Sequence, residues 1–161
     1  MPPRIIGCGN VDRGDDAAGV LVARRLRSLG IEAEEQSGES FSLIDCWQGC
    51  ETVIVVDAVC SGGKSGEVAI WDATTHPLPK AAVQCSTHAF GLYEAAELAR
   101  TLGRLPDKLL IYGIEGKQFT AGARPSAEVE QAVELVTQRI AELMQAVNRF
   151  RIENQSDGWR R

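Results

Sequence analysis

The chain has 161 residues, of which 44% are apolar and 24% charged, and its formal net charge is −5. This composition is typical of a globular protein with one core and predicts a single domain over residues 1–150. The charge and the lack of a Lys/Arg cluster argue against a nucleic-acid surface. No signal-peptide pattern and no run of about 20 apolar residues occurs, so we expect a cytoplasmic protein without a membrane partner.

Five cysteines are present, at Cys8, Cys46, Cys50, Cys60 and Cys85. In a reducing cytoplasm we expect them to be small buried side chains rather than disulfide partners. Cys46 and Cys50 are four residues apart and would share a helix face, which could supply two zinc ligands. No Cys-His pair with finger-like spacing completes such a set, so packing is the expected role for all five.

The first part of the chain shows the pattern of alternating strands and helices. The run Thr52 to Asp57 is continuously apolar, which is typical of a central strand covered on both faces. Further elements follow from apolar spacing and from glycines that end helices. We expect strands at Arg4 to Cys8 and Ile31 to Glu35, and helices from about Asp16 to Leu29 and from Phe41 to Gly49.

The second part continues this alternation. The link after the central strand is too short for a crossover helix, so a strand at Glu67 to Trp71 should run antiparallel if it joins the same sheet next to that strand. A helix from Phe90 to Leu102, a buried strand from Lys108 to Tyr112 and a last helix from Ser126 to about Val147 are expected. Ser126 is a good N-cap, and residues 151–161 are expected to be a mobile polar tail.

This order of elements predicts a three-layer α/β fold with a mainly parallel sheet. Ligands bind beyond the carboxyl ends of the strands in such sheets. Three segments should lie there, namely residues 9–16, 57–63 and 113–122. The first segment lacks the third glycine of a dinucleotide-binding fingerprint, and its three carboxylates would repel a pyrophosphate. We therefore do not expect a dinucleotide site there.

A cation suits the first segment better than a phosphate. Asp15 stands near a helix N-terminus, where the helix dipole favours a negative charge, and this ordinary role is enough to explain it. Asp16 stands beside it, Asp57 follows the central strand, and His88 precedes a helix. One imidazole and two carboxylates form a reasonable ligand set for a transition metal. The alternatives are a local turn cap for Asp57 and a structural role for His88.

Four segments in this order resemble the hydrogenase maturation proteases. They are Gly7-Cys8-Gly9-Asn10 with Gly14-Asp15-Asp16-Ala17-Ala18-Gly19, then Val55-Val56-Asp57-Ala58, then Ser86-Thr87-His88-Ala89-Phe90-Gly91-Leu92, and Tyr112-Gly113-Ile114-Glu115. The last segment leads through Gly122 and Ser126 into the final helix, so the resemblance spans roughly Arg4 to Val147, nearly the whole chain. Each motif is modest, but their order and spacing are specific.

The resemblance implies a three-layer α/β/α sandwich on a mainly parallel five-stranded sheet, of the phosphorylase/hydrolase-like type. It implies an endopeptidase that removes the C-terminal extension of a nickel–iron hydrogenase large-subunit precursor after nickel insertion. Three side chains would contact that nickel, which the substrate supplies, and they correspond to Asp16, Asp57 and His88. The family often has Glu at the position of Asp16. No organic cofactor is implied.

Two other functions stay open at this point. One is a metal-dependent assembly checkpoint that binds the precursor without cutting it, and the other is an α/β nucleotide-binding domain. For the protease, the ordinary pKa of His88 near 6.5 predicts that cleavage declines below neutral pH. The two carboxylates are expected to titrate in more acid solution.

Overall fold

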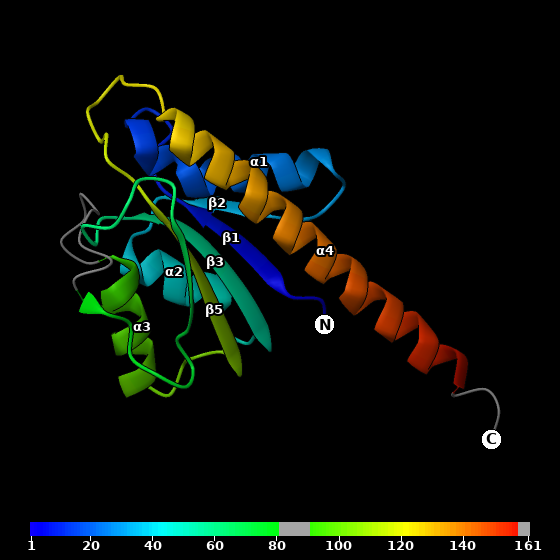
Figure 1. Cartoon of the computed structure of the whole chain (residues 1–161). Coiled ribbons are helices and arrows are strands. Elements are labelled where there is room, and N and C mark those ends of the chain that lie inside the picture. The colour runs from blue at the N-terminus through cyan, green and yellow to red at the C-terminus, as the bar shows by residue number, and fades with distance from the viewer. Residues whose placement is uncertain (81–90, 158–161) are drawn as a thin grey trace.

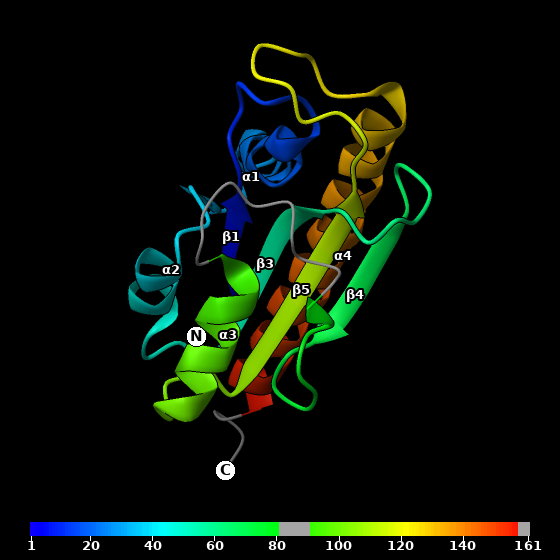
Figure 2. The same cartoon turned by 90° about the vertical axis from the view of Figure 1, so that its left-hand side faces the viewer.

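The computed structural model describes residues 1–80 and 91–157 of the chain. Its centre is a five-stranded sheet with the strand order β2-β1-β3-β5-β4 (Figure 1, Figure 2). The strands are β1 (Arg4–Cys8), β2 (Glu34–Gln36), β3 (Thr52–Val59), β4 (Val68–Asp72) and β5 (Lys108–Glu115). The helices are the 3-10 helix η1 (Gly14–Ala17) and the α-helices α1 (Ala18–Ser28), α2 (Ser40–Trp47), α3 (Leu92–Thr101) and α4 (Ala127–Asp157).

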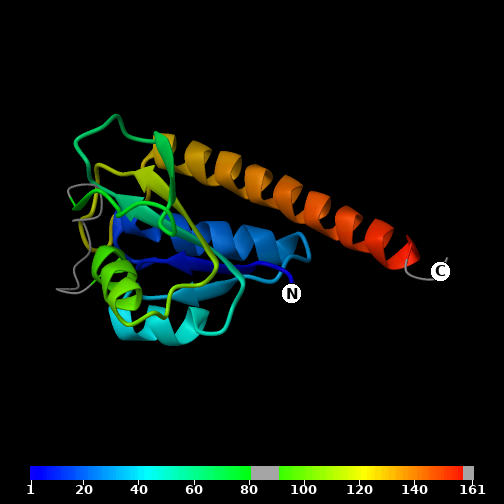
Figure 3. The same ribbon diagram turned by 90° about the horizontal axis from the view of Figure 1, so that it is seen from below.

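Helices cover both faces of the sheet (Figure 3). α1 packs against α4 on one face, and α2 packs against α3 on the other. The side chains of β3 alternate between the two cores: Val53 and Val55 enter the α2–α3 core, while Ile54 and Val56 enter the α1–α4 core. Burial on both faces explains the continuous apolar run of this strand. The predicted three-layer α/β/α fold is confirmed.

The direction of the strands decides where a site can form. β1 pairs in parallel with β2 and β3, and β3 pairs in parallel with β5. β4 runs antiparallel, but it pairs with β5 and not with its predecessor β3, so the neighbour on which the expected direction was based is a different strand. The carboxyl ends of β1, β3 and β5 therefore meet at one edge of the sheet, where loops from distant parts of the sequence come together.

Two central strands are longer than expected. β3 continues to Val59 and β5 to Glu115, because their last residues are still paired and mostly apolar. Asp57 therefore lies inside β3, opposite Gly113, and is only 8% exposed. The prediction that this strand ends at Asp57 is wrong, and the correction places the carboxylate deeper in the protein.

The edge strand β2 begins three residues later than the expected strand at Ile31. The reason is the C-terminus of α1, where Gly30 has a φ of 78°. The Gly30 N–H donates to the Arg27 carbonyl at 3.0 Å, and the Ile31 N–H donates to the Leu26 carbonyl at 3.0 Å. This pair of bonds is a Schellman motif. The backbone of Ile31 closes the helix, so the sheet begins only after it.

The last helix differs most from its expected length. α4 has 31 residues, which corresponds to roughly 46 Å at about 1.5 Å per residue. It continues past Val147 to Asp157, and its C-terminal part projects beyond the sheet (Figure 1, Figure 3). Residues 151–157 are thus helical, while a domain limit at residue 150 and the mobility of the tail stay predictions.

The cysteines follow the expectation in part. Cys8, Cys46 and Cys50 are free. Cys60 is disulfide-bonded, so the prediction of five reduced cysteines is wrong for this residue. Cys60 directly follows β3, and nothing in the residues around it indicates that it forms a disulfide.

Direct backbone contact between α1 and the sheet fixes their distance. A Cβ on Gly19 of α1 would lie 2.2 Å from the carbonyl oxygen of Val56 and 2.4 Å from that of Cys8. A Cβ on Gly7 of β1 would lie 2.1 Å from the carbonyl oxygen of Gly19. These distances are far below van der Waals contact, so the helix and the sheet can approach this closely only because both positions are glycine.

Replacing Gly19 by alanine tests this contact. The added Cβ meets two rigid backbone carbonyls, so we expect Gly19→Ala to lower the free energy of unfolding by about 3 kcal/mol or more, despite the better helix propensity of alanine. Gly30→Ala is the matched control, since no atom lies within 4 Å of a Cβ there. The expected loss for Gly30→Ala comes only from the strain of its positive φ and is about 1–2 kcal/mol in the free energy of unfolding. Urea denaturation of both variants measures the difference; equal losses would contradict the close-contact argument.

Candidate active site

The loop after β1 positions Asp16 at the carboxyl edge of the sheet. Asp16 lies in η1 and is 8% exposed. The backbone N–H of Asn10 donates to its Oδ2 at 3.1 Å, and the same N–H lies 3.2 Å from the Asp16 carbonyl. The chain between these residues closes into a compact loop, held further by a bond from the Asp16 N–H to the Arg13 carbonyl. The position of this carboxylate is therefore fixed by backbone contacts.

Asp57 is the second carboxylate at this edge. It comes from β3, and its Oδ1 accepts a hydrogen bond from the Ala58 N–H at 2.8 Å. Burial is the main cause that raises the pKa of Asp57 to about 7, and the charge of Asp16 raises it further. The bond from Ala58 acts in the opposite direction but is too weak to offset the other two. Near neutral pH this carboxyl group is therefore partly protonated.

Asp16 and Asp57 lie close enough to influence each other and a third buried group. Burial raises the pKa of the Cys8 thiol well above its ordinary value, and the charges of Asp57 and Asp16 contribute to this shift. The structure thus brings together two of the three predicted site residues. His88 lies outside the described residues, and its role stays a prediction.

Two carboxylates alone are a small ligand set. Among the residues that the structure describes, no group of three or more His, Cys, Asp or Glu side chains is arranged to hold a metal ion. Carboxylate oxygens nevertheless suit a divalent cation, and a cation would relieve the repulsion between two buried negative charges.

Asp15, next to Asp16, has a different role. It is fully buried, and its carboxylate accepts hydrogen bonds from the backbone N–H groups of Lys117, Gln118 and Ser126 at 2.6–2.9 Å. The Ser126 hydroxyl donates to it as well, at 2.9 Å. Burial alone would raise the pKa of Asp15, but these hydrogen bonds outweigh it and the pKa is lowered. Asp15 therefore ties the first loop to the start of α4, which is more than the helix-start role expected from the sequence.

Glu115 forms a similar tie at the end of β5 and was not singled out from the sequence. It is 4% exposed. Its carboxylate accepts from the Ser61 N–H at 2.9 Å, the Ser61 hydroxyl at 2.7 Å and the Gly63 N–H at 3.1 Å. This carboxylate shapes the loop after β3. Only the position of Glu115 at the end of a buried strand could have pointed to it.

Comparison with known proteins decides the family. A family model described as hydrogenase maturation protease matches residues 38–143, about two thirds of the chain. The chain belongs to the hydrogenase maturation protease family. The matched range contains Asp57 and Glu115, and the resemblance stated from the sequence motifs is confirmed.

Relatives and solved structures agree with this assignment. Protein FrxA of Pyrococcus furiosus is 31% identical over 122 residues, which cover 74% of this chain and 88% of that protein. The [NiFe] hydrogenase maturation protease HybD of Thermococcus kodakarensis superposes with a TM-score of 0.71 at 26% identity, covering 89% of this chain and 99% of that chain. HybD of E. coli shares the fold, with a TM-score of 0.74 at 20% identity and coverage of 91% and 94%.

The described part of this maturation protease contains no helix that is both long and apolar enough to cross a membrane. The long helix α4 is the obvious one to consider. Because its sequence is rich in charged residues, its length does not make it a candidate membrane span.

Removing Asp15 should unfold this maturation protease more readily. Asp15→Ala leaves three partly buried backbone N–H groups and the Ser126 hydroxyl without their acceptor, so we expect the free energy of unfolding to fall by about 3 kcal/mol. The loss should shrink at low pH, because a carboxylate with a lowered pKa stabilises the fold only while it is ionised. Denaturant titrations at pH 7 and pH 3 check this. Asp45→Ala, an exposed carboxylate of α2, is the control and should change little at either pH.

The raised pKa of Asp57 predicts that the free energy of unfolding changes with pH in the direction opposite to that expected for Asp15. Its pKa rises on folding from 3.8 to about 7, so between these values the folded state binds more protons than the unfolded state. Stability should therefore fall as the pH rises, by about 2–3 kcal/mol between pH 5 and pH 8. Asp57→Asn should remove this fall and be more stable than the wild type at pH 8. Urea denaturation of both proteins across this range measures it; parallel pH curves would show that Asp57 ionises normally.

Proposed function

We propose that this maturation protease is an endopeptidase that removes the C-terminal extension of a nickel–iron hydrogenase large-subunit precursor after nickel insertion. Nickel is part of the substrate in this proposal, held by the precursor. Asp16, Asp57 and His88 would contact it and bring the scissile peptide bond to the enzyme. Family membership supports the cleavage reaction, and the carboxylate pair supports recognition of a cation.

One observation carries the proposal. Asp57 is a buried carboxyl group whose pKa is raised to about 7, next to the negative charge of Asp16. Such a pair is unfavourable when both groups are ionised and no cation is near. A divalent ion removes the repulsion and displaces the proton. The ionised pair is therefore more stable with a bound cation than without one. An unloaded precursor provides no cation and would be recognised more weakly.

The chain's own residues then have defined tasks. The loop closed by Asn10 holds the carboxylate of Asp16, and β3 holds that of Asp57, so binding needs little rearrangement. Hydrolysis adds one water molecule across the peptide bond, and a base must accept a proton from this water. An ionised carboxylate at this edge can take that proton and return it to the leaving amine. A nearby metal ion would polarise the scissile carbonyl or the water.

Cleavage of nickel-loaded precursor is the decisive test. We expect Asp16→Ala, Asp57→Ala and His88→Ala each to reduce the cleavage rate at least about a hundredfold, since each removes a metal contact or the base. Mass spectrometry of the released peptide measures the rate, and circular dichroism checks that the variants are folded. Asp12→Ala is the control, because Asp12 is an exposed carboxylate of the same loop.

The outcomes separate this proposal from its alternatives. A stable nickel-dependent complex without released peptide would favour the assembly checkpoint. Cleavage that is equally fast with and without nickel would contradict metal recognition. Cleavage should also slow as the pH falls below 7, because Asp57 must lose its proton to contact the metal. Asp57 thus titrates in the range expected for His88, which corrects the expectation that both carboxylates titrate in more acid solution.

A further inference from the structure

β2 is an edge strand with one side open. The strand order places it at the end of the sheet, next to β1, and no strand of the described residues pairs with its other side. It has only three residues, Glu34–Gln36. Open edges present rows of backbone donors and acceptors to the surroundings, and another extended chain can pair with them.

The hydrogen bonds show which backbone groups face the open side. The Gln36 carbonyl accepts from the Gly9 N–H at 3.0 Å, so Gln36 faces β1. In a parallel strand the next residue faces the opposite way, so the N–H and C=O of Glu35 point outward. Ala33, two residues before Glu35, should also face away from β1. Its carbonyl is indeed bonded outside the sheet, to the side chain of Arg27 in α1 at 2.9 Å.

Two hollows border the segment that contains β2. One has a volume of about 690 Å³ and is lined along the strand by residues 30–34, with Arg4 and Cys50 among its other walls. The other has a volume of about 530 Å³ and is lined by residues 35–37, with Gly9, Asn10 and Val11. Every residue from 30 to 37 therefore lines one of the two hollows.

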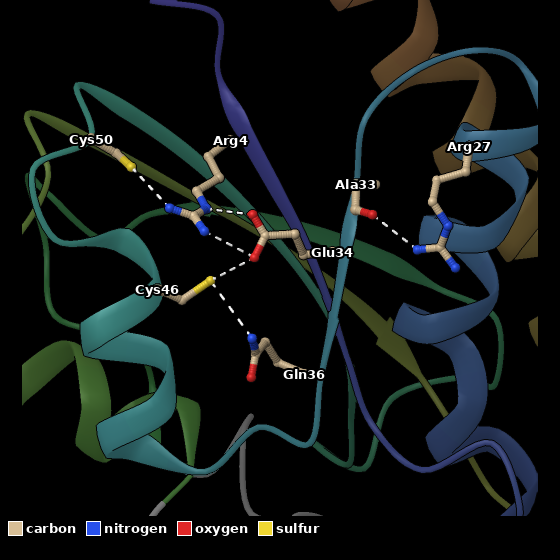
Figure 4. Close-up of polar contacts among 7 residues, drawn as sticks. All are labelled: Arg4, Arg27, Ala33, Glu34, Gln36, Cys46 and Cys50. Atoms are coloured by element: carbon tan, nitrogen blue, oxygen red, sulfur yellow. Dashed lines mark hydrogen bonds and ion pairs between the residues drawn. The ribbon is translucent and has the colours of Figure 1, made fainter.

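Side-chain contacts hold β2 in place on both faces (Figure 4). Arg4 of β1 pairs with Glu34 through two bonds of 2.6 and 3.0 Å, and Cys46 of α2 donates to the same carboxylate at 3.1 Å. On the α1 face, Arg24 and Arg27 both pair with Glu35. Because these contacts fix both faces, an incoming chain would meet an edge that is already ordered.

The second hollow leads directly to the candidate active site. It is lined by Gly9, which is bonded to Gln36, and by Asn10, whose N–H donates to the Asp16 carboxylate. A peptide lying along β2 would thus reach the Asp16 loop at its end. A short, charged edge strand often serves only to prevent aggregation; here the two hollows that border the segment and its continuity with the Asp16 loop favour an occupant.

We propose that the open edge of β2 binds the extended C-terminal segment of the precursor as an additional strand. This inference rests on the proposed function, because the segment is the one whose removal is proposed. The backbone groups of Glu35 and the N–H of Ser37 would pair with the peptide. Its side chains would alternate toward the two faces of the strand. Backbone pairing of this kind tolerates varied sequences, and the hollows select by size and polarity.

A proline at position 35 tests the pairing. Glu35→Pro removes an N–H that faces away from β1, so the β1–β2 ladder keeps its bonds, as edge prolines do. Glu35→Ala loses the same carboxylate and the same arginine pairs but keeps the N–H. We expect the KM for nickel-loaded precursor to be at least about tenfold higher for Glu35→Pro than for Glu35→Ala, with kcat similar. Equal KM values for two folded variants would overturn the proposal.

Hydrogen exchange provides a measurement without any change in β2. The precursor is added to the folded, cleavage-deficient Asp57→Ala variant, and amide exchange is followed by NMR. Slower exchange at Glu35 and Ser37 is expected; unchanged exchange there, with a complex formed, would overturn the edge assignment even if Glu35→Pro does not fold. A wild type that cleaves no nickel-loaded precursor would instead overturn the proposed function, and this inference with it.

Discussion

The close approach of α1 to the sheet is the constraint on which the site depends. Gly7 and Gly19 allow backbone to touch backbone, with no side chain between the helix and the two central strands. η1 leads straight into α1, so this contact also sets how near Asp16 comes to Asp57. A larger residue at either glycine would push the first loop outward and separate the two charges. The raised pKa of Asp57 is thus a consequence of packing as well as of local chemistry.

The buried carboxylates differ in how many donors surround them. Asp15 and Glu115 each accept several hydrogen bonds from backbone and hydroxyl groups. These hydrogen bonds make both carboxylates ties between loops, and they lower the pKa of Asp15. Asp57 accepts one short backbone bond and faces another negative charge. The number of donors therefore separates carboxylates that hold the structure together from one that can exchange a proton for a cation.

The sequence predicted the layers, the strand directions and the approximate place of most elements because apolar spacing and glycine positions are local signals. It also predicted that Asp16 and Asp57 lie at the same edge of the sheet, since residues near strand ends can be read from the same pattern; their role stays a prediction. It could not assign Asp15, whose partners lie more than 100 residues away. It missed Glu115 and the disulfide at Cys60 for the same reason, because only the folded chain brings such partners together. The length of α4 was underestimated because its last turns lack an apolar pattern.

The tie from Asp15 to Ser126 joins residues 111 positions apart. During synthesis the first loop emerges long before its partners do. At about 5–20 residues per second, the ribosome needs roughly 6–22 s to add the intervening chain. The loop that carries Asp16 is therefore incomplete on any nascent chain that has not reached the start of α4. A truncated translation product that lacks the start of α4 would retain the first carboxylates in sequence but not their arrangement.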